Sequence, residues 1–500
     1  MIETISNINE AVNNVVWGWP ALILLAVVGI LMTFLTKWFQ VSHIGHWFKK
    51  TIGAIFRDKH VTSHTQDKSI SQFQSLCTAL AATVGTGNIV GAAGAIIVGG
   101  PGAVFWMWFM AFFGMMTNYS ENVLGIFFRK KDKKGAWAGG AMYYLRDGLG
   151  AKKHCRWVGV ILAVIFSVCA LLASFGIGNM TQINSISGSM NSVFGIPNWV
   201  SGLVLVAAVG LVVVGGLKRI ASVTEKIVPL MVIIYLIGSL VIFFVNIGQV
   251  PAVFIAIFKG AFAARSVGGG IVGYGIKLAV EMGMKRGVFS NEAGLGSSVM
   301  VHSSSNVHEP VRQGMWGIFE VFADTIVVCT LTAFSILSSG LVDLGTGATV
   351  TEYAGQAVTK ANLVSSVFSM HFGFAGAAFV AIALALFAYS TVLGWSHYGT
   401  ISFEYLFGSK GTIIYHIIFV VAVFGGAVMG ENLAWEIADT LNGMMMIPNL
   451  IGVLVLSPIV YRITKNYVDR HMKNIDVEPM LSNDPDIQAE QAAGVKAGED

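Results

Sequence analysis

Long runs of apolar residues recur along almost the whole chain, separated by short polar or basic segments. A helix needs about 20 mostly apolar residues to cross a bilayer core that is about 30 Å thick. The pattern therefore predicts eleven membrane-spanning helices, near residues 19–37, 72–99, 101–128, 157–185, 199–217, 227–246, 253–283, 314–339, 370–395, 411–429 and 432–461. After about residue 465 the apolar pattern stops, and we expect a polar, disordered tail.

Basic residues are concentrated in alternate loops between these runs. The loops that follow the first and third spans are rich in Lys and Arg, whereas residues 186–198 and 247–251 carry no charge. Because short cytoplasmic loops carry an excess of Lys and Arg, we expect the N-terminus outside and the C-terminus in the cytoplasm. The acidic N-terminal sequence MIETISNINE does not resemble a signal peptide, so the first span is expected to remain in the mature protein.

The composition is typical of a chain surrounded by lipid. Hydrophobic residues make up 55% of the sequence, charged residues make up only 12%, and the mean hydropathy is +0.70. Average proteins contain about 25% Asp, Glu, Lys and Arg, so a soluble fold is excluded. A net charge of +4 gives no support for nucleic-acid binding. We expect an all-α, multi-pass protein of the cell membrane with the lipid bilayer around it.

Sequence motifs of catalysis are absent. The chain has no H-E-x-x-H, G-x-S-x-G or Walker motif. The cysteines are far apart and lack C-x-x-C spacing, so we interpret them as small packing residues: Cys77, Cys155, Cys169 and Cys329. We therefore expect neither an enzyme nor a bound cofactor.

Glycines cluster in the second and seventh predicted spans. The first cluster is in ATVGTGNIVGAAG and comprises Gly85, Gly87, Gly91 and Gly94; the second is in SVGGGIVGYG and comprises Gly268, Gly269, Gly270, Gly273 and Gly275. The clusters lie five spans apart, in the second and seventh spans, so the two segments cross in opposite senses, as an inverted repeat of five helices requires. Unwound backbone inside a membrane persists only where protein, ion or ligand covers it. Such paired breaks indicate a transporter's binding site, although glycines also allow close helix packing.

The side chains around the first break are neutral, namely Thr83, Thr86 and Asn88. Half-helix N-termini offer N–H groups to a carboxylate, and the carbonyls freed at the break suit a sodium ion or an ammonium group. Neither break has a charged residue at its centre. A small zwitterion, which brings both charges itself, therefore fits better than a sugar or a cation.

Several longer strings carry a family resemblance. TVGTGNIVGAAG, GGPGAVFWMW, GNMTQ, RGVFSNEAGLGSS, YSTVLGWSHYG and IADTLNGMMMIPNL together resemble the alanine or glycine:cation symporter family, also called sodium:alanine symporters. This resemblance implies a leucine-transporter-like fold, with two inverted halves of five helices and an extra N-terminal span. The expected division is an N-terminal span and basic loop at 1–70, the two five-helix repeats at 71–250 and 251–463, and the cytoplasmic tail at 464–500.

The resemblance also implies sodium-coupled uptake of alanine, glycine or a related small neutral amino acid, with some members taking glutamine. The expected substrate-binding residues are Thr83, Gly85, Thr86, Gly87, Asn88, Gln182, Gly268, Gly269, Gly270 and Trp395. The expected sodium ligands are the carbonyls of Ala81 and Val84 and the hydroxyls of Ser390 and Thr391. Asn88 could also serve a second ion.

Alternatives to these assignments remain open. The hydroxyls of Ser390 and Thr391 could bond to their own helix, and Gln182 could simply hold two helices together. Proton coupling in place of sodium, selectivity for glutamine, and a receptor that binds amino acids without transporting them are alternative functions.

Ionisable residues inside membrane helices are costly and usually paired or functional. Two pairs are four residues apart, the oppositely charged Lys277 and Glu281 and the like-charged Glu320 and Asp324. We expect an ion pair in the first. The second could share a cation or a proton, or could pair with Arg286 or Arg312 in an inner gate.

Overall fold

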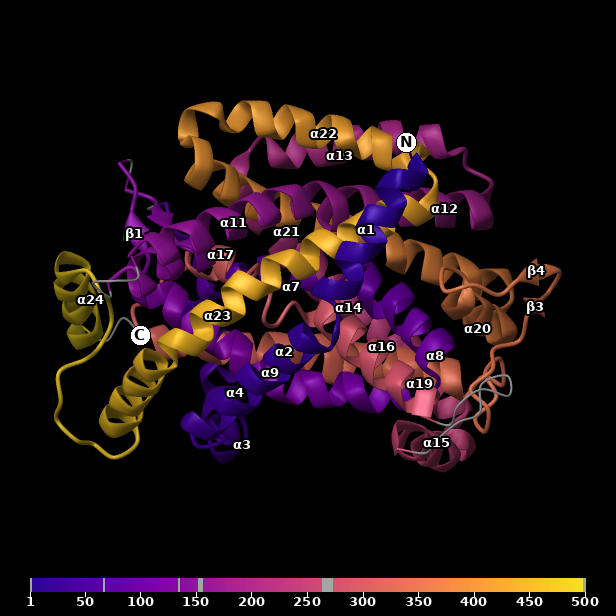
Figure 1. Cartoon of the computed structure of the whole chain (residues 1–500), viewed down its shortest axis with the longest axis horizontal. Coiled ribbons are helices and arrows are strands. Elements are labelled where there is room, and N and C mark those ends of the chain that lie inside the picture. Colours follow the sequence, from indigo (N-terminus) through magenta and orange to yellow (C-terminus); the bar gives the residue numbers. More distant parts are fainter. Residues whose placement is uncertain (1, 66–67, 134, 152–155, 263–272, 498–500) are drawn as a thin grey trace.

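The structure is a computed structural model that describes residues 2–65, 68–133, 135–151, 156–262 and 273–497. It is a bundle of helices (Figure 1) with two short antiparallel strand pairs, β1 (Lys130–Lys131) with β2 (Trp137–Ala138) and β3 (Glu352–Tyr353) with β4 (Gln356–Ala357). The helices of the first half are α1 (Ile2–Val16), α2 (Trp19–Leu35), α3 (Phe39–Ser42), α4 (Ile44–Lys50), α5 (Ile52–Ile55), α6 (Lys59–Thr62), α7 (Gln72–Thr83), η1 (Gly87–Gly91), α8 (Ala92–Gly99), α9 (Gly102–Phe127), α10 (Ala141–Tyr143), η2 (Tyr144–Leu149), α11 (Arg156–Phe175), η3 (Gly176–Met180), α12 (Thr181–Phe194), α13 (Asn198–Val213) and α14 (Gly216–Val245). Those of the second half are η4 (Ile247–Gln249), α15 (Val250–Phe262), α16 (Gly273–Asn291), α17 (Val299–His302), α18 (Pro310–Val321), η5 (Phe322–Cys329), α19 (Thr330–Leu337), α20 (Leu363–Phe372), α21 (Phe374–Phe407), η6 (Ser409–Gly411), α22 (Thr412–Val428), α23 (Glu431–His471) and α24 (Pro485–Ala497).

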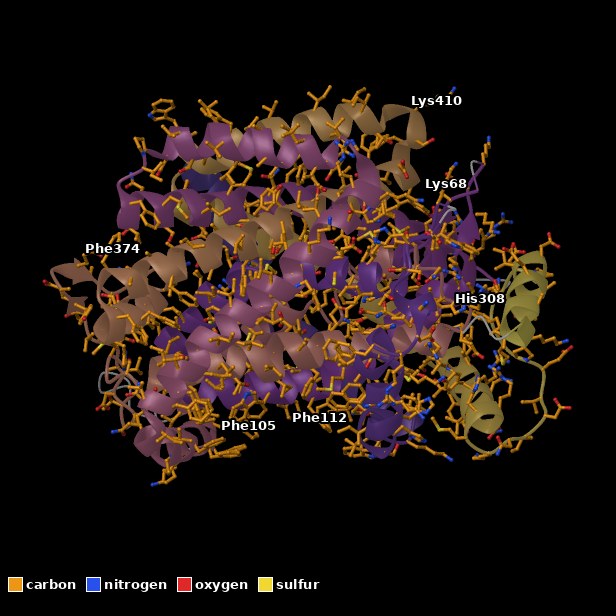
Figure 2. The ribbon with its side chains drawn as sticks, turned by 180° about the vertical axis from the view of Figure 1, so that it is seen from behind. Lys68, Phe105, Phe112, His308, Phe374 and Lys410 are labelled. Carbon is orange, nitrogen blue, oxygen red and sulfur yellow. The ribbon has the colours of Figure 1, made fainter. Side chains whose placement is uncertain are left out.

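Within the described residues, seven helices are long and apolar enough to cross a membrane, and the bent pair at 72–99 would make an eighth. This finding confirms a mostly helical, multi-span protein, while the count of eleven spans stays a prediction. The polar stretch AWEIADTLNG lies within the continuous helix α23. Figure 2 shows Lys68, His308 and Lys410 at one end of the bundle and Phe374 at the other.

The outer helices expose apolar faces. Side chains on α13, α14 and α22 that are more than half exposed include Leu203, Leu211, Ile237, Ile417 and Val421. Exposure of this kind on long helices is expected where lipid replaces water as the solvent. The core lies behind this layer, where α9 packs along α16 and α18, and α7 packs against α14 and α21.

The second predicted span is interrupted where the glycines predicted it. Helix α7 begins with a capping box, in which the Ser71 side chain accepts the Gln74 N–H and the Gln74 side chain accepts the Ser71 N–H. It ends at Thr83, and the helix resumes at Gly87 after a bend of 48°. Glycine is a poor helix former; Gly85 lies in the bend itself and Gly87 is the first residue of η1.

The break expected at Gly268, Gly269 and Gly270 in the seventh predicted span stays a prediction. The structure has two helices there, α15 and α16, and residues 263–272 lie outside the described residues. A separate buried, irregular segment follows α16 at residues 292–298, where Glu292, Gly294 and Gly296 have φ angles of 57°, 94° and 72°. Its backbone is covered by protein, since Asn449 Nδ2 donates to the Gly294 carbonyl at 2.8 Å. We call residues 292–298 the second interruption.

The C-terminal region is not the disordered tail that its composition suggested. Helix α23 continues to His471, and α24 packs back onto the bundle with Leu481 and Ile487 buried. The Asn483 N–H donates to the Phe127 carbonyl at the end of α9 (2.9 Å). In Figure 1, α24 lies at the opposite end of the bundle from α20.

Glu309, which precedes α18, ties the end of α23 to the bundle. Its carboxylate accepts two hydrogen bonds of 2.7 Å from Arg470 and one of 2.9 Å from His471. Burial raises the pKa of Glu309, but the hydrogen bonds from His471 and Arg470 outweigh this effect, and the net pKa lies below its ordinary value. The carboxylate form therefore stabilises the fold above the ordinary pKa of a glutamate, and this contribution is lost as the pH falls through the lowered pKa.

We expect Glu309→Gln to lower the free energy of unfolding at neutral pH by about 2 kcal/mol, less than for a fully buried pair because Arg470 and His471 retain some contact with water. The difference from wild type should shrink below about pH 4, and thermal unfolding of the purified protein across pH measures it. Glu490→Gln is the control, because the pair between Glu490 and Lys131 is exposed and should contribute less than about 0.5 kcal/mol. Equal effects of the two substitutions would contradict this account.

Candidate functional site

Residues 84–86, between α7 and η1, form the first interruption. Side chains accept hydrogen bonds from two of its backbone amides. Asn88 Oδ1 accepts the Gly85 N–H at 2.9 Å, and Gln182 Oε1, from α12, accepts the Thr86 N–H at 3.3 Å. These are the amides that a helix leaves free when it begins again after a break. The Thr86 hydroxyl is buried and has no hydrogen-bond partner. The interruption therefore presents N–H groups and an unpartnered hydroxyl inside the protein.

Three of the four expected sodium ligands meet at the junction of α7 and α21. The Ala81 carbonyl accepts hydrogen bonds from the hydroxyls of Thr391 (3.0 Å) and Ser390 (3.4 Å), and the fourth, Val84, is buried directly after the end of α7. Both hydroxyls also donate to the Phe387 carbonyl of their own helix. The two hydroxyls thus bond both to their own helix and to the end of α7. The carbonyl and hydroxyl oxygens at this junction are hard ligands of the kind that a sodium ion prefers.

Gly85 lies in direct contact with this junction. A Cβ atom added at Gly85 would overlap Thr391 Oγ1 and would lie 3.4 Å from Gln182 Oε1. Only glycine fits here without displacing a hydroxyl expected to bind the ion. The first interruption, the α21 hydroxyls and Gln182 therefore form one compact site, and its residues are at most 3% exposed.

Gln182 and Thr83 have different surroundings. Gln182 bonds both to its own helix region, through Nε2 to the Ile177 carbonyl (3.0 Å), and to the first interruption. Gln182 therefore does more than hold two helices together, because its Oε1 accepts a hydrogen bond from the backbone that is expected to bind the substrate. The Thr83 hydroxyl donates to the Ala79 carbonyl of its own helix at 3.3 Å, so the structure gives Thr83 no contact of its own in the site.

Trp395 lies one helical turn beyond Thr391 and is fully buried, but its contacts are elsewhere. Its Nε1 donates to Glu292 Oε1 at 2.9 Å, and its ring packs directly against Gly178. It therefore links α21 to the second interruption and to η3. Within the described residues its hydrogen bond goes to Glu292 and not to the first interruption, and its expected role in substrate binding stays a prediction.

The sequence did not identify Asp324 and Ser290 as part of this site. Asn88 Nδ2 donates to Asp324 Oδ1 at 2.7 Å, and the hydroxyls of Ser290 and Thr325 donate to Asp324 Oδ2 at 2.7 and 2.8 Å. A Cβ added at Gly87 would lie 3.2 Å from the Ser290 Cα, so η1 and the end of α16 touch. The two interruptions are therefore adjacent, and a buried carboxylate joins them through Asn88.

Two signals in the sequence pointed toward this carboxylate without locating it. Glu320 and Asp324, two acidic residues four positions apart, marked an unusual pair. The string FSNEAGLGS contains Ser290 and most of the second interruption. Their contact with Asn88 depends on tertiary packing among η1, α16 and η5, which no local pattern reports.

Other charged residues form pairs that the sequence anticipated only in part. Lys277 Nζ and Glu281 Oε1 are 3.7 Å apart, which confirms the expected pair. Arg286 pairs with Asp439 and Arg312 pairs with Asp58, so the expectation that these arginines neutralise Glu320 and Asp324 is wrong. In the described part of the chain, no group of three or more His, Cys, Asp and Glu side chains is arranged to hold a metal ion.

The cysteines behave largely as expected. Cys77, Cys169 and Cys329 are buried free thiols, and Cys155 lies outside the described residues. Cys329 does more than fill space, because its sulfur lies 3.4 Å from Asn88 Nδ2 and 3.2 Å from Ser290 Oγ. The Cys329 thiol is therefore a weak hydrogen-bonding partner of Asn88 and Ser290.

A cavity of about 230 Å³ lies next to η1. It is lined by residues of η1, α12, α20, α21 and the segment before α20, among them Val90, Ser185, Ser189, Asn362 and Ser365. The residues of the site itself are buried. The arrangement is thus a closed site with a small polar cavity next to it.

Comparison with known proteins gives consistent results. The profile of the sodium:alanine symporter family matches residues 2–480. The sodium/alanine symporter AgcS of Methanococcus maripaludis is 43% identical over 466 residues, covering 93% of this chain and 98% of that protein. Two Bacillus subtilis proteins are also similar: the putative sodium/proton-dependent alanine carrier protein YrbD is 36% identical, covering 93% of each chain, and the probable sodium/glutamine symporter GlnT is 35% identical, covering 97% of this chain and 95% of that protein.

Proposed function

The chain belongs to the sodium:alanine symporter family, which is a family of transporters and not of enzymes, and we propose that it imports alanine, glycine or a similar small neutral amino acid together with sodium. Transport proceeds by alternating exposure of one site to the two sides of the cell membrane. The observation that carries the proposal is the shared location, at the first interruption, of two backbone amides bonded to side chains and of a backbone carbonyl bonded to two hydroxyls.

The substrate carboxylate binds the amides of Gly85, Thr86 and Gly87, where a half-helix N-terminus provides N–H groups and positive dipole. Binding displaces the side-chain acceptors of Asn88 and Gln182, which satisfy two of these amides in the closed site. Sodium binds on the opposite side of Gly85, among the carbonyls of Ala81 and Val84 and the hydroxyls of Ser390 and Thr391. A small substrate is favoured because every residue of the site is buried.

The transport unit consists of two inverted five-helix halves, 71–250 and 251–463, preceded by the N-terminal span. Eleven spans place the N-terminus outside and the C-terminus in the cytoplasm. The grouping of Lys68 and Lys410 at one end of the bundle supports this orientation (Figure 2), because basic loops face the cytoplasm.

Uptake of labelled alanine into proteoliposomes tests the sodium coupling. We expect uptake to require an inward sodium gradient, and Thr391→Ala to raise the sodium concentration for half-maximal uptake about tenfold, because losing one buried oxygen partner costs roughly 1–3 kcal/mol. Thr400→Ala is the matched control, since the Thr400 hydroxyl bonds to the Ser396 carbonyl of the same helix, farther along (2.7 Å). Uptake that persists unchanged when choline replaces sodium would refute the proposal.

Substrate choice is tested by competition. Alanine and glycine should compete with labelled alanine better than glutamine does, because the closed site offers little free volume. Stronger competition by glutamine would assign the chain to the specificity named for GlnT. Binding without exchange of labelled for unlabelled alanine across the membrane would identify a receptor.

A further inference from the structure

A fully buried pair of side chains lies between the two interrupted helices, outside the residues assigned to substrate and sodium. His302, in α17 just after the second interruption, has its Nε2 3.0 Å from Glu320 Oε2 in α18, and both side chains are 0% exposed. His302 Nδ1 lies 3.1 Å from Ser75 Oγ in α7, the helix that leads to the first interruption. The pair thus touches an element from each interrupted helix.

Gln313 contacts His302 on the side of the ring opposite to Glu320. Gln313 Oε1 accepts the Ser305 hydroxyl at 3.0 Å, and Gln313 Nε2 lies 2.5 Å from His302 Nδ1. In this orientation of the amide Nδ1 accepts, and the ring hydrogen is on Nε2, directed at Glu320. Burial lowers the pKa of His302 to about 3, so His302 is neutral at physiological pH.

An ionised Glu320 would be a buried charge without a counter-ion. Its hydrogen-bond donors, His302 and Asn118 Nδ2 (3.3 Å), both meet Oε2. The other oxygen, Oε1, is buried and has no partner. Burying a charged carboxylate among neutral groups is expensive. A proton on Oε1 removes the charge and leaves Oε2 free to accept both hydrogen bonds.

The titratable groups that face Glu320 strengthen this conclusion. Glu121 on α9, Glu292 in the second interruption, Asp324 one turn along the same helix and Tyr398 on α21 interact with it electrostatically, and each is negative when ionised. In the part of the chain that the structure describes, no Lys or Arg forms an ion pair with Glu320. The described neighbours of Glu320 therefore provide no positive charge to balance an ionised carboxylate.

We propose that Glu320 binds and releases a proton during the transport cycle. It holds the proton on Oε1 while α7, α17 and α18 are packed together as in this structure. When these helices separate, water reaches Oε1, the O–H bond breaks, the electron pair stays on the carboxylate and the proton passes to water. Closing the helices reverses the step. Raising the pH therefore favours the open arrangement, because the closed one binds one more proton. This inference rests on the proposed transport function.

The test measures sodium-driven alanine uptake by the full-length protein in proteoliposomes, with equal pH on both sides, between about pH 5.5 and 8.5. Wild-type uptake should change at least about threefold through one midpoint, as expected for one essential titrating group. Glu320→Gln, which is permanently neutral, should give a flat profile. Glu281→Gln should keep the wild-type profile, because it removes the partner of Lys277 within α16, a different helix from that of Glu320.

A flat wild-type profile, or an unchanged pH dependence in Glu320→Gln, would overturn the proposal. If Glu320→Gln does not fold, Glu320→Asp decides, because it keeps the carboxyl but withdraws it from His302: a shifted midpoint supports the proposal and an unshifted one overturns it. A complete lack of sodium-driven uptake in wild type would instead refute the proposed function, so the two failures are distinguishable.

Discussion

Gly85→Ala is expected to lower sodium-driven alanine uptake by about 100-fold, because displacement of reacting or binding groups by about 1 Å has effects of this size. The added methyl group would occupy the position of Thr391 Oγ1 and would press on Gln182 Oε1. Either the hydroxyl leaves the Ala81 carbonyl or the interruption shifts, and both changes damage the ion site. Initial uptake rates in proteoliposomes, with the amount of folded protein measured in parallel, give the result.

Gly91→Ala is the matched control on the same interrupted helix. A Cβ added at Gly91 would meet no atom within 4 Å, and alanine is a better helix former than glycine. This variant should retain uptake close to wild type. Loss of uptake in both variants would mean that the interrupted helix needs glycine for flexibility throughout, and would contradict the specific contact of Gly85 with Thr391.

Asn88→Asp is expected to lower uptake by about 100-fold, since like charges placed together cost several kcal/mol. Asn88 donates to Asp324 and accepts from Gly85, so one amide joins the first interruption to the buried carboxylate. A carboxylate at position 88 keeps the acceptor for Gly85 but loses the donor and faces Asp324 with the same charge. Uptake and equilibrium alanine binding would both report the loss.

Combining Asn88→Asp with Asp324→Asn restores a donor and an acceptor with their positions exchanged. The double variant should regain at least about tenfold of the uptake lost in Asn88→Asp, because residues in direct contact are energetically coupled. Asp324→Asn alone should keep the hydrogen bond to the Ser290 hydroxyl. This single variant therefore measures the effect of removing the charge while that hydrogen bond remains. Additive losses in the double variant would show that Asn88 and Asp324 act independently.

The sequence predicted the first interruption well because its cause is local. Gly85, Gly87 and the neutral residues between them interrupt a long apolar run, and such breaks are satisfied inside a membrane only by covering groups. The hydroxyls of Ser390 and Thr391, assigned through the family resemblance, lie against the Ala81 carbonyl as expected.

The sequence did not predict the second interruption because few glycines mark it. The break expected at 268–270 lies outside the described residues and stays a prediction, whereas the buried irregular backbone at 292–298 contains Gly294 and Gly296, and Glu292 itself adopts a left-handed conformation. What stabilises this segment is Asn449, from a helix about 150 residues away in the sequence. Composition within one segment cannot report a partner that distant.

The C-terminal region shows the same limit in another form. Its polar, acidic composition is typical of disorder, yet α24 is held by scattered contacts, such as Asn483 with Phe127, and by the buried side chain of Leu481. The contacts of Glu309 with Arg470 and His471 fix the preceding end of α23. Few apolar residues suffice when the bundle provides a surface to dock on.

The central claim is that sodium and the amino acid occupy the two sides of the first interruption and stabilise each other there. Calorimetric titration of the purified protein tests it most directly, with alanine titrated at several sodium concentrations and sodium titrated with and without alanine. The claim predicts that each ligand lowers the dissociation constant of the other by the same factor, at least about fivefold, because linkage between two sites is reciprocal. Dissociation constants for alanine and sodium that do not depend on each other would contradict it.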